Sequence, residues 1–116
     1  MTRSIDGIYA AYLSGQAGRG FAMLLFRKGK IVGADSVGTL FDGSYSDHST
    51  GYDFELQVKL PPNSPLIQGG TIGPYPELNV VNAILPADFL SLEFIRIDGK
   101  HGPVNVKLVL VREIDD

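Results

Sequence analysis

Three carboxylates in the first half of the chain could supply acid–base chemistry: Asp35, Asp42 and Glu55. A carboxyl acts as a general acid near neutral pH only when its surroundings raise its pKa, as burial does. All three stand in polar or glycine-containing stretches, where aspartates more often shape turns by accepting backbone hydrogen bonds. No serine lies in a Gly-x-Ser-x-Gly elbow. We therefore predict a protein that is not an enzyme and has no catalytic residues.

Metal-ligating residues are sparse, because the chain has no cysteine and only two histidines, His48 and His101. Asp47, His48 and Asp53 could coordinate a cation weakly, but their spacing is more typical of a solvated loop. His101 lies in a glycine-flanked segment that predicts an exposed hairpin tip. The sequence predicts no metal site and no cofactor.

Glycines recur at four- or five-residue intervals from Gly29 through Gly33 and Gly38 to Gly43. A phosphate-binding loop would need a Gly-x4-Gly-Lys-Ser/Thr run leading into a helix. The residues after Gly33 include β-branched side chains and no helical pattern. We interpret these glycines as turns, bulges and close crossings of short strands.

The composition is that of one folded domain spanning residues 1–116, with 44% hydrophobic residues. A net charge of −3 argues against a general nucleic-acid binder, because the phosphate backbone attracts dense Lys and Arg. The longest apolar run, residues 21–26, is too short to cross a bilayer. With no apolar leader at the N-terminus, the sequence predicts a cytoplasmic protein of bacterial type with no membrane partner.

Short apolar segments bounded by turn residues predict an all-β domain. The predicted strands cover residues 5–14, 19–27, 31–34, 53–60, 78–85, 92–97 and 104–112. Residues 86–90 permit one helical turn. Seven or eight short strands with so little helix indicate an antiparallel barrel or sandwich.

Strand 53–60 alternates without a fault, which places four apolar side chains on one face: Phe54, Leu56, Val58 and Leu60. In an eight-stranded barrel such a face lines the lumen, which side chains either fill or leave open to one apolar ligand. We name these four residues as a possible apolar cavity and leave both alternatives open.

Residues 21–26 are apolar at every position, as in a strand covered on both faces. Val109 and Val111 likewise interrupt the polar side of the last strand. We therefore predict a homodimer whose face includes Ala22, Leu24, Phe26, Val109 and Val111.

Four stretches in order resemble one family: residues 6–9 (Asp-Gly-Ile-Tyr), Gly20 leading the second strand, residues 29–35 (Gly-Lys-Ile-Val-Gly-Ala-Asp), and residues 42–45 (Asp-Gly-Ser-Tyr) before the alternating strand. They look like the GrlR-type negative regulators of type III secretion. The resemblance runs from about residue 6 to residue 112. It implies a small lipocalin-like β-barrel that dimerises and represses by binding a transcriptional activator instead of DNA.

The resemblance also suggests where such a partner binds, since the family uses an acidic loop before the alternating strand. Here residues 46–53 hold two acids in that place, and the candidate partner-binding residues are Asp42, Asp47, His48 and Asp53. The expected function is therefore a regulatory binding protein that sequesters a protein partner. The alternative is a lipocalin-like binder of a small apolar ligand.

Overall fold

The computed structural model describes residues 4–114 and contains eight strands and one short 3-10 helix. The bounds are β1 (Gly7–Ser14), β2 (Arg19–Arg27), β3 (Lys30–Asp35), β4 (Leu40–His48), β5 (Gly51–Leu60), β6 (Glu77–Pro86), η1 (Phe89–Ser91), β7 (Ile95–Gly99) and β8 (Gly102–Glu113). Every pairing between neighbouring strands is antiparallel. The all-β prediction is confirmed.

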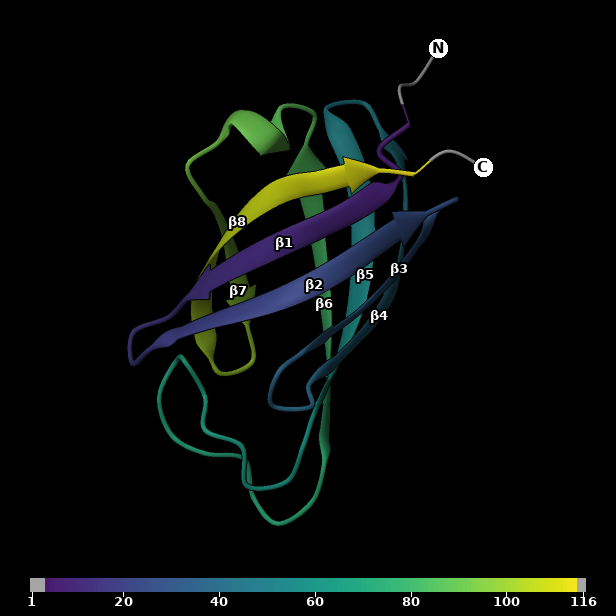
Figure 1. The fold of residues 1–116 in the computed structure, drawn as a ribbon. Coiled ribbons are helices and arrows are strands. Elements are labelled where there is room, and N and C mark those ends of the chain that lie inside the picture. The colour runs from purple at the N-terminus through teal and green to yellow at the C-terminus, as the bar shows by residue number, and fades with distance from the viewer. Residues whose placement is uncertain (1–3, 115–116) are drawn as a thin grey trace.

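The strands form one sheet in the order β6-β5-β4-β3-β2-β1-β8-β7, which curls into a nearly closed barrel. Figure 1 shows β8, β1 and β2 side by side across the front, with β5 and β6 behind them. The two edge strands, β6 and β7, approach each other without a backbone ladder. A seam between these strands is therefore where the barrel stays open.

Tight turns join most neighbouring strands and set their register. In the β2–β3 turn, Lys28 and Gly29 both have positive φ, 48° and 81°. Two such residues make the turn whose twist matches that of the flanking strands. This geometry confirms that the first glycine of the 29–43 series serves a bend.

The barrel encloses a single apolar core. Its buried members include Tyr9, Leu24, Phe26, Phe41 and Leu108, which point inward because side chains alternate along a strand. At one end η1 covers the barrel with the buried ring of Phe89. At the other end the connection over residues 61–76 lies against the β1–β2 turn, where the Ala17 N–H donates to the Ile67 carbonyl over 2.7 Å.

The sequence-based strand bounds were wrong in three places, one of them the strand predicted over residues 92–97, which runs from Ile95 to Gly99. No strand was predicted over β4, and residues 46–53 were expected to form a loop. In the structure β4 and β5 continue to a hairpin tip at Ser49 and Thr50. The serines, aspartates and glycine of β4 have low strand propensity, so its conformation follows from pairing with β3 and β5.

Candidate functional site

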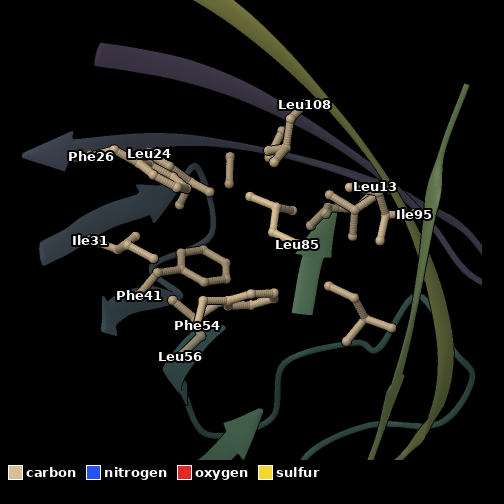
Figure 2. Close-up of a pocket in the computed structure, with 14 residues that line it drawn as sticks. Leu13, Leu24, Phe26, Ile31, Phe41, Phe54, Leu56, Leu85, Ile95 and Leu108 are labelled. Atoms are coloured by element: carbon tan, nitrogen blue, oxygen red, sulfur yellow. The ribbon is translucent and has the colours of Figure 1, made fainter. Parts of the chain in front are cut away.

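A cavity of about 80 Å³ lies inside the barrel. Figure 2 shows the side chains of several strands converging on it. All eight strands contribute, and every lining residue is apolar: Ala11, Leu13, Ala22, Leu24, Phe26, Ile31, Phe41, Phe54, Leu56, Leu85, Ile95, Ile97, Val106 and Leu108. A cavity without polar atoms has nothing to hold a water molecule, so it stays dry or accepts apolar matter.

The predicted lumen ladder of β5 lies on the inner face, as the alternation indicated. Phe54 and Leu56 line the cavity, and Val58 packs against the core beside it. Leu60 is half-buried at the end of the strand and does not reach the cavity. Two of the four candidate residues therefore contribute directly.

Three residues predicted for the dimer face belong instead to this cavity. Ala22 and Phe26 are 1% and 3% exposed, Leu24 is 9% exposed, and all three line the lumen. A strand with two apolar faces does not reveal from its own pattern which face points inward, and the wrong set was chosen. Val109 and Val111 do face outward.

The candidate partner-binding residues lie along the β4–β5 hairpin and do not gather in a flexible loop. Asp42 and Asp53 are exposed on its outer face, where Glu55 lies opposite Ser44. Asp47 and His48 stand at the tip, and the Thr50 N–H donates to His48 Nδ1 over 3.1 Å. The outer face of the hairpin therefore carries several carboxylates, with Leu40 and Lys59 opposite each other at the end away from the tip.

The carboxylates considered for catalysis do not meet around a cavity. Asp35 shapes a turn, because its Oδ1 accepts hydrogen bonds from the N–H groups of Val37 and Thr39 over 3.0 and 2.9 Å. Asp42 and Glu55 face outward from β4 and β5. Within residues 4–114, no group of three or more histidine or acidic residues is placed to hold a metal ion.

His101 lies in the turn of the β7–β8 hairpin, as the sequence suggested, but its side chain is not free in solvent. Its Nε2 contacts the Glu77 carboxylate at the start of β6, and Lys100 Nζ lies 3.4 Å from the other carboxylate oxygen. The hydrogen bond with His101 is the main cause that lowers the pKa of Glu77 to about 2. These contacts join β6 to the β7–β8 turn at one end of the seam.

A polar cluster at the η1 end of the barrel was missed by sequence reasoning. The hydroxyl of Tyr45 donates to Asp6 Oδ1 over 2.7 Å, and the Lys28 N–H donates to the same oxygen over 3.1 Å. The Tyr9 hydroxyl donates to the Ile5 carbonyl over 2.7 Å. Long-range pairing brings Asp6, Lys28 and Tyr45 together, so no local motif marks their contacts.

Both of these tyrosines have raised pKa values. Burial raises the pKa of Tyr9 to about 12, and the nearby charges of Asp6 and Glu113 add to the effect. Burial also raises the pKa of Tyr45 to about 12, helped by its hydrogen bond to Asp6. The cluster borders a second hollow of about 350 Å³ below η1. Both phenols are thus held neutral as hydrogen-bond donors.

No family model matches the chain, and comparison with curated proteins and with solved structures finds no significant match. Among residues 4–114, no helix has the length and apolar character needed to span a membrane. The cavity and the hairpin carboxylates are therefore interpreted from their own geometry.

Proposed function

We propose that the protein is a binding protein whose barrel holds a small apolar ligand. The observation that carries the proposal is the wholly apolar lining of the cavity, to which every strand contributes. Within the described residues, every buried side-chain nitrogen and oxygen has a hydrogen-bond partner. A polar ligand would lose its hydrogen bonds to water on entering the cavity, and no group in this lining could replace them.

The size of the cavity limits the ligand. About 80 Å³ is roughly half of the ~150 Å³ at which an engineered apolar cavity accepts benzene. A flat ring is therefore too large without movement of the lining. The class that fits is the end of an alkyl chain, with the rest of the ligand leaving the barrel.

A cavity-filling substitution tests this proposal. Ala22→Leu adds three carbon atoms to a lining residue that is 1% exposed. A group the size of a water molecule occupies about 30 Å³. Three added carbon atoms therefore take up most of the cavity. We expect xenon to bind the wild type and to bind Ala22→Leu at least about tenfold more weakly, measured by xenon NMR.

The matched control is Ala34→Leu, the same chemical change at an exposed position on β3. It should bind xenon as the wild type does. Native mass spectrometry of protein purified from its own host would then identify a bound apolar mass. Absence of xenon binding to the wild type would refute the ligand proposal.

A second proposal is a regulator that sequesters a protein partner, as the likeness to GrlR-type negative regulators of type III secretion suggests. It is supported by the carboxylates of Asp42, Asp53 and Glu55, which face outward on one hairpin. The three carboxylates make no hydrogen bond or ion pair with another side chain or backbone group within residues 4–114. Such a face suits a basic surface on a transcriptional activator or another protein.

Neutralising the hairpin face tests the regulator proposal. We expect Asp42→Asn/Asp53→Asn to weaken capture of the partner by about 3- to 10-fold, because exposed ion pairs each contribute up to about 1 kcal/mol. Cross-linking in the native host followed by quantitative mass spectrometry measures this. Asp98→Asn, which removes an exposed carboxylate from β7, is the control. Equal recovery with both variants would contradict the proposal.

A further inference from the structure

The hollow below η1, here called the η1 hollow, is a separate space from the apolar cavity, and the two share no lining residue. It lies where the start of β1, the end of β8 and η1 meet at one end of the barrel (Figure 1). Pockets that hold small molecules begin at about 300 Å³. With about 30 Å³ for each group of water size, the 350 Å³ of this hollow has room for about ten such groups. The η1 hollow is therefore large enough for a small molecule.

Tyr52 presents an unused hydroxyl to the η1 hollow. The residue points into the barrel from β5 and is 9% exposed, and its hydroxyl makes no hydrogen bond within residues 4–114. In the same part of the chain every fully enclosed side-chain oxygen has a partner. The Tyr52 oxygen is therefore not enclosed, and it opens into the hollow that the residue lines. A hydroxyl held in a largely apolar setting costs free energy until a ligand or water meets its hydrogen-bonding capacity.

The charges around the η1 hollow have one sign. Among the described residues that line it, the charged ones are all acidic: Asp6, Asp88 and Glu113. Oδ1 of Asp6 is occupied by the two hydrogen bonds of the polar cluster, whereas its Oδ2 makes none within residues 4–114. The side chain of Asp88 also makes no hydrogen bond there. Carboxylates around one concave site produce a negative potential that attracts a cation.

Aromatic rings complete the wall of the η1 hollow. Phe89 is 2% exposed, and its ring centroid lies 6.0 Å from that of Tyr9 and 6.2 Å from that of Tyr52. A cation within about 6 Å of a ring centroid is attracted to the aromatic face. Within residues 4–114 no three acidic or histidine side chains converge as a metal ion requires. Carboxylates together with rings therefore favour an organic cation.

We propose that the η1 hollow binds a small aliphatic amine in its protonated, ammonium form. An ammonium group has three N–H donors and no acceptor. Oδ2 of Asp6 and the hydroxyl oxygen of Tyr52 accept two of these donors, and the rings pack against the carbon chain. Both groups act on the Tyr9 hydroxyl, whose pKa each of them raises, so they lie on the same part of the hollow. This site is additional to the apolar cavity and does not depend on it.

An NMR titration with n-butylammonium, n-butanol and butyrate, which share one carbon chain, tests the proposal. We expect butylammonium to shift the backbone amides of residues 4–6 and 87–91. It should bind at least about tenfold more tightly than butanol, because charge-assisted hydrogen bonds are roughly twice as strong as neutral ones. Butyrate should not bind, since its charge has the same sign as that of the hollow. Tyr52→Phe keeps the ring and should weaken butylammonium binding about tenfold, through the loss of one hydrogen bond to a charged group.

Two variants serve as controls. Tyr75→Phe removes an exposed phenol and should bind butylammonium as the wild type does. Ala22→Leu should also bind it normally, because Ala22 lines only the apolar cavity. Circular dichroism melting confirms that each variant folds. Equal affinity for butylammonium and butanol, normal binding by Tyr52→Phe, or amide shifts confined to the β4–β5 hairpin would each overturn the proposal.

Discussion

Gly43→Ala should lower the free energy of unfolding by about 2–3 kcal/mol, the cost of forcing atoms into a closely packed site. At Gly43, β5 crosses so close to β4 that an added Cβ would overlap the Glu55 carbonyl oxygen and lie 3.1 Å from Leu56 Cα. Both obstacles are backbone atoms, which no side-chain rotation relieves. Relief requires the β4–β5 ladder to separate locally.

The matched control is Gly73→Ala, in the connection between β5 and β6. An added Cβ there has no neighbour within 4 Å, and Gly73 lacks a positive φ. Alanine at a compatible site restricts the unfolded chain and stabilises by about 0.4–1 kcal/mol. Urea unfolding followed by circular dichroism compares the two variants. If Gly43→Ala unfolds at the same urea concentration as Gly73→Ala, the close crossing does not limit this position.

The spacing of the glycines thus predicted turns and close crossings, but it did not show which strand lies against each glycine. The residue types between Gly29 and Gly43 were by themselves enough to argue against a phosphate-binding loop. That Gly43 faces β5 depends on a pairing with Leu56, which no local pattern displays. A local pattern of residues marks a bend. The tertiary fold decides which neighbouring strand needs the space beside the glycine.

The same limit explains what was predicted about the cavity. Alternation from Phe54 to Leu60 identified an inward face, because one side of that strand is wholly polar. On β2 both sides are apolar, so the pattern identified a strand but could not say that Leu24 points inward and Met23 outward. Only the curvature of the closed sheet decides which side is the lumen.

Polar contacts between distant strands were the least predictable feature. Glu77 and His101 are 24 positions apart, and Asp6 meets Tyr45 across 39. The sequence placed Asp6 within the first predicted strand and His101 in an exposed hairpin tip, since each has local neighbours typical of those roles. Their partners are supplied by the order of strands in the sheet.

The stability of the protein should fall steeply between about pH 10 and pH 12, and Tyr9→Phe should reduce that slope. In an unfolded chain a tyrosine ionises near pH 10, whereas burial raises the pKa of Tyr9 to about 12. Between those values the unfolded state has lost a proton that the folded state keeps. Rising pH therefore favours unfolding, by up to about 1.4 kcal/mol per pH unit for a fully titrating group.

Tyr9→Phe should behave differently on the two sides of pH 10. At neutral pH it should cost about 1 kcal/mol, because the Ile5 carbonyl loses the hydrogen bond from the phenol while the ring keeps its packing against Phe26. Above pH 10 that deficit should shrink and then reverse, since the variant has no buried phenol to ionise. Urea unfolding at stepwise pH compares it with Tyr75→Phe, which removes an exposed phenol and should follow the wild type. Parallel curves for Tyr9→Phe and the wild type would show that the buried phenol does not drive alkaline unfolding.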